Sequence, residues 1–240
     1  MHDLEKKIIL AEKANIKMIV TDGAFSMDGE VCPLPEIRKL ADKYGAVVLV
    51  DDCHGIGVIG KTGRGTEEYH HMKGGADIIT ANLSKALGGS SAGFVAGSQD
   101  LIDLLRRLSR TFVFSTALSP ATVACSSKVL DILMRDKTIL EKLQKNTMMF
   151  RNGMKEAGFE LKGTNHPCCP VMLRHDVVAC KVANYLFQHG IFAPCIVVPL
   201  CEEGEQKIRV MINAAHSEEQ IQETLALFAH AKRKFIDLQE

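Results

Sequence analysis

Residues 46–55 read Ala46-Val47-Val48-Leu49-Val50-Asp51-Asp52-Cys53-His54-Gly55 and are the most informative part of the sequence for the fold. Its first five residues form a continuous apolar run, which is typical of a parallel strand that is covered on both faces. Two carboxylates, a thiol and an imidazole follow directly after this run. Because ligands of α/β sheets bind at the carboxyl ends of parallel strands, the stretch predicts a buried strand that leads into a candidate site.

Strands and helices alternate on both sides of this stretch. A helix is expected to open at Pro33-Leu34-Pro35 and to end at Gly45, because proline favours the first helical turn and glycine the position after the last. The alternation predicts an α/β fold with a mainly parallel sheet. The strands are expected at residues 16–20, 46–50, 77–80 and 92–96.

The pattern changes in the second half of the chain. A long, charged amphipathic helix is expected over 137–158, followed by strands at 170–173 and 208–212 and by further helices. Ser217-Glu218-Glu219-Gln220 has the form of a capping box and predicts the start of the last helix. We therefore expect two regions: residues 1–136, which carry the α/β sheet, and residues 137–240, which form a connecting helix and an α+β domain.

Composition narrows the possible functions. The charges balance at 29 Lys+Arg against 29 Asp+Glu without a basic stripe, so nucleic acid is not an expected partner. No apolar run approaches the roughly 18 residues of a membrane-spanning helix, so no membrane is expected either. Residues 1–7 have the pattern of an amphipathic helix rather than of a targeting segment. The eight cysteines contain no Cys-x-x-Cys pair and are interpreted as free thiols of a reducing compartment, the mitochondrial matrix or the cytoplasm.

One motif is misleading. Gly55-Ile56-Gly57-Val58-Ile59-Gly60 matches the G-x-G-x-x-G pattern of dinucleotide-binding proteins. That pattern requires a helix that opens on the second glycine and directs its amides at a pyrophosphate. Residues 61–65 instead contain two more glycines and no helical period. The motif is therefore interpreted as a loop that needs positive φ angles, and not as a nicotinamide site.

Polar stretches follow three predicted strands, at 25–29, at 51–54 and around Lys85. An aspartate, a histidine and a lysine over one sheet suit the chemistry of pyridoxal 5′-phosphate (PLP). The lysine amine must be neutral to bind the cofactor covalently, so a partly desolvated setting among small residues is expected for it. An aspartate at the ring nitrogen keeps that nitrogen protonated.

Simpler interpretations of the same residues remain open. Lys85 can be a solvated surface lysine, His54 an ordinary loop histidine, and Asp51 and Asp52 can cap a helix or bind a cation. A metal site is the competing use of these groups, but it lacks a fixed ligand spacing. Its ligands would come from Asp51, Asp52, His54, His70 and His71.

Four stretches show a family resemblance: Thr21-Asp22-Gly23-Ala24-Phe25-Ser26-Met27-Asp28-Gly29, Val50-Asp51-Asp52-Cys53-His54-Gly55, Gly63-Arg64-Gly65 and Ser84-Lys85-Ala86-Leu87-Gly88-Gly89. With them the sequence resembles the α-oxoamine synthases, which are PLP enzymes of fold type I that condense an amino acid with an acyl-CoA. The resemblance extends over essentially the whole chain. It implies an incomplete large PLP-binding domain with a mainly parallel sheet, followed by a small C-terminal α+β domain.

The resemblance also implies a role for individual residues. Lys85 corresponds to the lysine that forms the Schiff base, and Asp51 to the partner of the ring nitrogen. His54 and Ser26 correspond to the residues at the phenolic oxygen of the cofactor. Asn82 corresponds to the residue at the cofactor phosphate, where the family usually has threonine. Ser115 corresponds to a residue that reaches the phosphate of the cofactor in the other subunit, which implies a homodimer. Arg209 corresponds to the residue at the substrate carboxylate, which a guanidinium binds in bidentate fashion.

Glycine and acetyl-CoA are the substrates that the resemblance favours, in the reaction that forms 2-amino-3-ketobutyrate and in its reverse in threonine catabolism. Members that use alanine and a pimeloyl thioester are the second interpretation, and a catalytically silent member of the family is the third. The resemblance also implies that the family's N-terminal portion precedes the first residue of this sequence. That portion carries an aromatic residue that stacks on the cofactor ring, so weak PLP binding and low activity are expected of these 240 residues alone.

Overall fold

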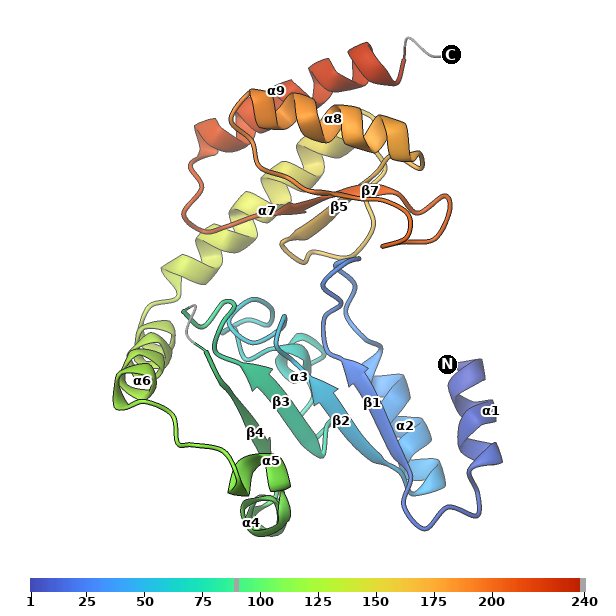
Figure 1. Ribbon diagram of the computed structural model, residues 1–240, viewed down its shortest axis with the longest axis vertical. Helices are drawn as coiled ribbons and strands as arrows, with labels where there is room; N and C mark the ends of the chain where they lie inside the picture. The colour runs from blue at the N-terminus through green and yellow to red at the C-terminus, as the bar shows by residue number, and fades with distance from the viewer. Residues whose placement is uncertain (89–90, 238–240) are drawn as a thin grey trace. The chain divides into compact units, whose positions relative to one another are not determined.

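The computed structural model describes residues 1–88 and 91–237 of the chain (Figure 1). Its contacts divide the chain into two compact units. The first unit comprises Met1–Phe25 and Val31–Lys137, and the second comprises Ser26–Glu30 and Thr138–Glu240. The short segment Ser26–Glu30 thus packs with residues that come far later in the sequence.

The first unit is built on a four-stranded sheet in the order β1-β2-β3-β4. Its strands are β1 (Met18–Asp22), β2 (Val47–Asp51), β3 (Ile78–Asn82) and β4 (Gly93–Gly97). The first three strands are parallel, and β4 runs antiparallel to β3. The prediction of an α/β fold with a mainly parallel sheet is confirmed. Each strand begins one or two residues later than predicted, because backbone pairing continues into polar residues at which the apolar pattern has already ended.

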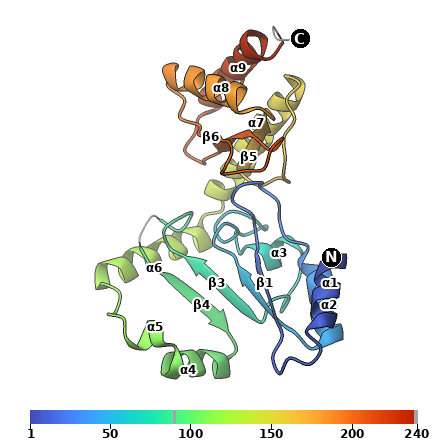
Figure 2. The same cartoon turned by 45° about the vertical axis from the view of Figure 1, so that its right-hand side comes forward.

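Two helices cover one face of this sheet. They are α1 (His2–Leu10) and α2 (Leu34–Tyr44), which lie side by side next to β1 in both views (Figures 1 and 2). Leu34, Ile37 and Ala41 of α2 pack with Val48 and Val50 of β2 in one apolar cluster. Gly45 ends α2 in the left-handed conformation (φ 61°), as the sequence predicts.

The prediction that β2 is covered on both faces is wrong. Val48 and Val50 are buried in the cluster with α2, whereas Val47 and Leu49, which point to the other face, are only half-buried. Val20 of the neighbouring strand lies 63% exposed. A continuous apolar run is compatible with cover on one face as well as on two, so it could not reveal that the second face of the sheet is open in this chain.

The remaining helices of the first unit follow the glycine-rich loop and the last strand. They are α3 (Thr66–Tyr69), α4 (Gln99–Leu108), α5 (Arg110–Val113) and α6 (Pro120–Arg135). Figure 2 shows α4 and α5 at one end of β4. No residue of α4 is buried, although its leucines gather on one side of the helix.

The second unit is an α+β arrangement. Its three-stranded antiparallel sheet has the order β5-β7-β6, with β5 (Cys168–Met172), β6 (Cys195–Ile196) and β7 (Lys207–Met211). Its helices are α7 (Thr138–Glu156), α8 (Asp176–Gln188) and α9 (Glu218–Phe235). The predicted capping box is present, since Ser217 and Gln220 bond reciprocally at the start of α9.

Apolar and charged side chains alternate along β7, so the two faces of this small sheet differ. Val171, Ile208 and Val210 point into the helix-covered core, where they pack with Phe150 and Phe228. Lys207 and Arg209 occupy the alternate positions and point to the opposite face. Within the described parts of the chain, no helix is long and apolar enough to span a membrane.

Candidate active site

The ends of β2 and β3 bring two candidate site residues into one region of the first unit. Asp51 is the last residue of β2, and its Oδ1 accepts a hydrogen bond from the Cys53 amide at 3.1 Å. Lys85 lies in the loop after β3, and its Nζ donates to the Cys53 Sγ at 2.8 Å. Because β2 and β3 are parallel neighbours, with Asp51 opposite Thr80, their carboxyl ends direct both loops to the same edge. Burial raises the pKa of the Cys53 thiol, and the hydrogen bond from Lys85 opposes this rise.

The expected desolvation of Lys85 is not found in this chain. Its side chain is exposed, as are those of Ser84 and Ala86 beside it. Leu83 and Leu87, by contrast, are buried to 7% and 2% exposure. The leucines anchor the loop and the lysine extends away from it. The small neighbouring residues, on which the prediction of burial rests, also suit an exposed turn.

Asn82 and His54 lie in the same region. Asn82 ends β3, and its Oδ1 accepts hydrogen bonds from the amide and the hydroxyl of Ser84, each at 3.2 Å. The amide nitrogen of Asn82 is therefore the group that could donate to a phosphate. His54 is half-buried in the turn after β2. Gly89, the last residue of the Ser84–Gly89 motif, lies outside the described residues.

Asp52 has a different role from Asp51. It is only 2% exposed and accepts hydrogen bonds from the amide (2.8 Å) and hydroxyl (2.6 Å) of Thr66, the first residue of α3. The alternative interpretation, that an aspartate here caps a helix, thus applies to Asp52. Burial raises the pKa of its carboxyl to about 6, although the bonds from Thr66 oppose this rise. The two-residue period of the strand places adjacent aspartates on opposite faces.

The raised pKa of Asp52 predicts a pH-dependent stability. The folded chain holds a proton on Asp52 up to about pH 6, whereas the unfolded chain loses it near 3.8. The folded state therefore binds more protons in this window, and stability must fall as pH rises through it. We expect the free energy of unfolding, relative to that of Asp52→Asn, to drop by about 2 kcal/mol between pH 4 and pH 6.

Urea unfolding of both proteins across this range measures the difference. Because asparagine does not titrate, the free energy of unfolding of Asp52→Asn depends on pH only through the other groups. Subtracting it at each pH leaves the contribution of Asp52. A difference that stays constant between pH 4 and pH 6 would show that Asp52 has an ordinary pKa.

Ser26 and Arg209 both lie near Cys168 in the second unit. Arg209 lies in β7 opposite Pro170, one diagonal step from Cys168. The same thiol donates to the carbonyl oxygen of Ser26 at 3.2 Å. Burial raises the pKa of Cys168, and Arg209 opposes the rise. The Nε of Arg209 is buried and has no hydrogen-bond partner among the described residues.

Two further sequence predictions concern the first unit. Ser115 follows α5 and is exposed, with its hydroxyl 3.5 Å from the Thr116 carbonyl oxygen.

No helix begins within Gly55–Gly60, and α3 starts only at Thr66, as the interpretation of this motif as a loop requires. Gly57 and Gly60 both have positive φ. Within residues 1–88 and 91–237, no three His, Cys, Asp or Glu side chains form a group that could hold a metal ion.

Comparison with known proteins identifies the class. Residues 1–228 match the family described as aminotransferase class I and II, and the chain belongs to this family. It is 44% identical over 233 residues to the mitochondrial 2-amino-3-ketobutyrate coenzyme A ligase of Homo sapiens, covering 97% of this chain and 56% of that protein. It is 41% identical over 230 residues to the 8-amino-7-oxononanoate synthase of Petrotoga mobilis, covering 95% and 58%. The chain thus spans little more than half the length of these relatives.

Solved structures agree with this assignment. Serine palmitoyltransferase from S. paucimobilis, with a bound PLP–myriocin aldimine, superposes with a TM-score of 0.90 at 30% identity, over 98% of this chain and 59% of that one. The resemblance that the sequence motifs indicated and the predicted fold are therefore both confirmed.

Proposed function

We propose that this chain carries the cofactor-binding lysine of a PLP-dependent acyltransferase that condenses glycine with acetyl-CoA. The observation that supports this most directly is the contact between Lys85 Nζ and the Cys53 Sγ, two residues beyond Asp51, at the carboxyl ends of β2 and β3. It places a primary amine and a carboxylate at the carboxyl ends of adjacent parallel strands, where α/β sheets bind ligands. The 44% identity to a 2-amino-3-ketobutyrate coenzyme A ligase favours glycine and acetyl-CoA.

The donor groups of this region fit PLP. Lys85 offers an accessible amine, and the fold uses Asp52 rather than Asp51 to cap α3. Asp51 is therefore available to a ring nitrogen, while the amide of Asn82 and the imidazole of His54 are polar groups in the same loops. When bound, PLP supplies an electron sink for negative charge at the α-carbon of an amino acid.

Each of these residues would act in its own way. Lys85 would hold the cofactor through its amine and then move the proton of the α-carbon, because an exchangeable amine can serve as a base once the substrate has displaced it. Asp51 would keep a proton on the ring nitrogen by its negative charge. His54 would orient the cofactor by a hydrogen bond to its phenolic oxygen.

The second unit would contribute the substrate contacts. The planar fork of Arg209 suits the carboxylate of glycine, since two parallel N–H groups can bind its two oxygens. Its buried Nε without a partner marks a guanidinium whose hydrogen-bonding capacity is not filled within the described residues. The carbonyl oxygen of Ser26 accepts from the Cys168 thiol, whose pKa Arg209 lowers.

We also propose that the active form is a homodimer in a reducing compartment, in the mitochondrial matrix or the cytoplasm. The exposure of Ser115 is compatible with contact to a cofactor in a second subunit. The cysteines among the described residues are all free, as such a compartment would keep them. Because Lys85 is exposed in this chain, we expect slow turnover and weak PLP binding from the 240 residues by themselves.

Substitution of Asp51 tests the role of the ring partner. Asp51→Asn should leave the fold unchanged, because its hydrogen bond from Cys53 can be accepted by the amide oxygen. It should lower turnover by about two orders of magnitude or more, since the ring nitrogen loses the charge that keeps it protonated. The measurement is the rate with glycine and acetyl-CoA after loading with PLP. A rate near that of the unsubstituted chain would assign the role to another residue.

Substrate choice separates the candidate functions. PLP is titrated into the purified chain and followed by visible absorbance, and acetyl-CoA consumption with glycine is then measured by chromatography, since the eight protein thiols would react with a thiol dye. Activity with alanine and a pimeloyl thioester instead would favour the second candidate, which the identity to the Petrotoga mobilis enzyme supports. PLP binding without either activity would indicate a catalytically silent member.

A further inference from the structure

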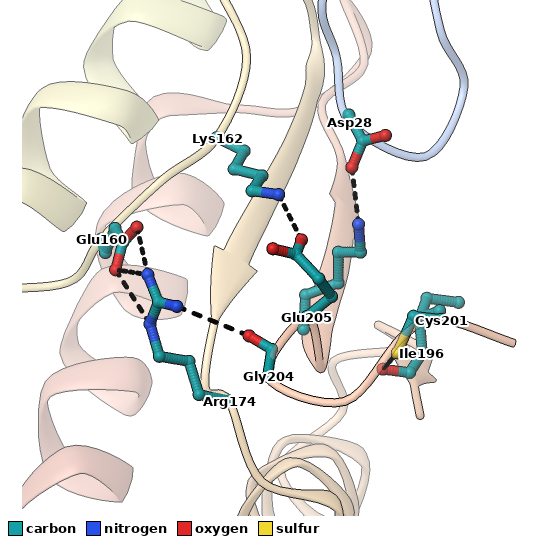
Figure 3. A network of polar contacts seen from close by, with 9 residues as sticks. Asp28, Glu160, Lys162, Arg174, Ile196, Cys201, Gly204 and Glu205 are labelled. Atoms are coloured by element: carbon teal, nitrogen blue, oxygen red, sulfur yellow. Dashed lines mark hydrogen bonds and ion pairs between the residues drawn. The ribbon is translucent and has the colours of Figure 1, made fainter. Parts of the chain in front are cut away.

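Three residues of the segment Ser26–Glu30 are hydrogen-bonded to later residues of the second unit. Lys207 Nζ on β7 donates to Asp28 Oδ1 at 2.6 Å, and the amide of Thr164 donates to the carbonyl of Gly29 at 3.0 Å. Ser26 is bonded to Cys168, as described above. Figure 3 shows Asp28 on its loop with a dashed line to the amine from β7. The segment therefore lies against the face of the sheet that carries Arg209.

Close backbone approach fixes this position. Gly29 has a φ of +65°, and a Cβ there would lie 2.3 Å from the carbonyl oxygen of Cys168. No other residue could adopt this contact without displacing β5. The segment consequently has little freedom to shift along the sheet.

The lysine of the Asp28–Lys207 ion pair is more buried than the cations of the neighbouring pairs, while the Asp28 side chain is 39% exposed. The Lys207 side chain is 5% exposed, whereas the side chains of Arg174 and Glu160 in the same network are 52% and 55% exposed. A buried ammonium needs a partner, because an unpaired charge is costly away from water, while exposed pairs contribute little. Asp28 is the partner that the structure provides for it.

Lys207 and Arg209 are the two cationic side chains on this face of β7. They are two residues apart on one strand, so both side chains extend to the same face of the sheet. Asp28 lies between two residues that approach Cys168, since the Cys168 thiol donates to the carbonyl oxygen of Ser26 and Gly29 lies against the Cys168 carbonyl oxygen. Arg209 and Asp28 shift the pKa of this thiol in opposite directions, Arg209 lowering it and Asp28 raising it. Among the described residues Asp28 pairs with Lys207, and no ion pair is formed by Arg209.

We propose that Lys207 is a positioning residue that holds Asp28 away from Arg209 and so keeps the Arg209 guanidinium available to a carboxylate ligand. Without Lys207, Asp28 would lose its partner, pair with Arg209 and compete with the ligand. The assignment of that ligand as the carboxylate of an amino-acid substrate rests on the proposed function. The competition between the two cations for Asp28 does not.

The first experiment measures the reactivity of Arg209 in the chain without cofactor. Phenylglyoxal labels guanidinium groups, and mass spectrometry of the peptide that contains Arg209 follows the rate. We expect Lys207→Met to slow labelling of Arg209 roughly fivefold or more, because a newly formed ion pair protects it. The double variant Lys207→Met with Asp28→Asn should restore the rate, which a merely structural defect would not do.

Lys162→Met is the matched control. Its ion pair with Glu205 belongs to the same network but is partly exposed and does not involve the segment Ser26–Glu30. It should leave the labelling of Arg209 unchanged. Circular dichroism shows whether each variant folds. If Lys207→Met does not fold, Lys207→Arg replaces it, because arginine retains the pair with Asp28. The labelling rate of Arg209 in Lys207→Arg should equal that in the unsubstituted chain. Unchanged or faster labelling in a folded Lys207→Met, or slower labelling in Lys207→Arg, would overturn the proposal.

The second experiment tests whether the ion pair between Lys207 and Asp28 affects the binding of the substrate. In the PLP-loaded chain, Lys207→Met should raise the KM for glycine about tenfold with a smaller change in kcat, and Asp28→Asn on that background should reverse the increase. Slower labelling of Arg209 together with no glycine-dependent activity in any variant would uphold the positioning role and refute the proposed function. Slower labelling with an unchanged KM would overturn the link to the substrate carboxylate.

Discussion

Replacement of Lys85 by arginine abolishes the covalent attachment of PLP to this chain, if the proposed function is correct. Arginine keeps the positive charge and reaches at least as far, so contact with Cys53 can persist. Its guanidinium cannot lose a proton in a protein, however, and it therefore cannot act as the nucleophile that an amine provides. Turnover should fall by several orders of magnitude for the same reason.

Borohydride reduction measures this directly. After incubation with PLP and reduction, the peptide that contains Lys85 should carry a pyridoxyl group in the unsubstituted chain and lack it in Lys85→Arg. Lys61→Arg is a suitable control, because Lys61 is also exposed and lies in the glycine-rich loop of the same unit. Equal labelling of a different lysine, unaffected by Lys85→Arg, would end the assignment.

The second large effect is expected on stability. Arg151 on α7 is 4% exposed and donates to the carbonyl oxygens of Lys162 (3.1 Å), His166 (3.2 Å) and Cys168 (2.9 Å). Arg151→Met keeps an apolar stem but leaves these acceptors without their donor, and each buried unsatisfied group costs about 1–3 kcal/mol. We expect the free energy of unfolding to decrease by about 3–5 kcal/mol.

Urea unfolding provides the measurement, with Lys155→Met as the control in the same helix. Lys155 is exposed, so its replacement should change the free energy by no more than about 0.5 kcal/mol. If Arg151→Met fails to fold, Arg151→Lys, which retains the charge but fewer donors, should show an intermediate loss. A loss below about 1 kcal/mol in Arg151→Met would mean that water replaces the guanidinium at these carbonyl groups.

Some features of the candidate site could be predicted from the sequence, and others could not. The motifs around Asp51, His54 and Lys85 led to the correct family, because a family's chemistry is carried by short local stretches of sequence. The exposure of Lys85 could not be predicted, since burial depends on which distant segments cover a loop. Arg151 and Lys207 were missed for a similar reason: an arginine or a lysine within an amphipathic pattern is usually solvated.

The sequence by itself determined the features that depend on neighbours along the chain. The apolar run at 46–50 became β2, Gly45 ended α2, and Ser217 with Gln220 capped α9. In each case the signal is a backbone preference or a side-chain hydrogen bond that acts over at most a few residues. Such signals are complete within a short stretch and need no tertiary contact to be recognised.

Three other features depend on long-range packing: which face of β2 is covered, which aspartate caps α3, and where the segment Ser26–Glu30 packs. The ion pair of Asp28 with Lys207 joins residues 179 positions apart, and the bond from Cys168 to Ser26 joins residues 142 apart. Contacts at such separations depend on how whole elements pack, because closing a long loop costs entropy that only the completed unit can offset. The surroundings of Arg209 are therefore a property of the folded second unit and not of any stretch of its sequence.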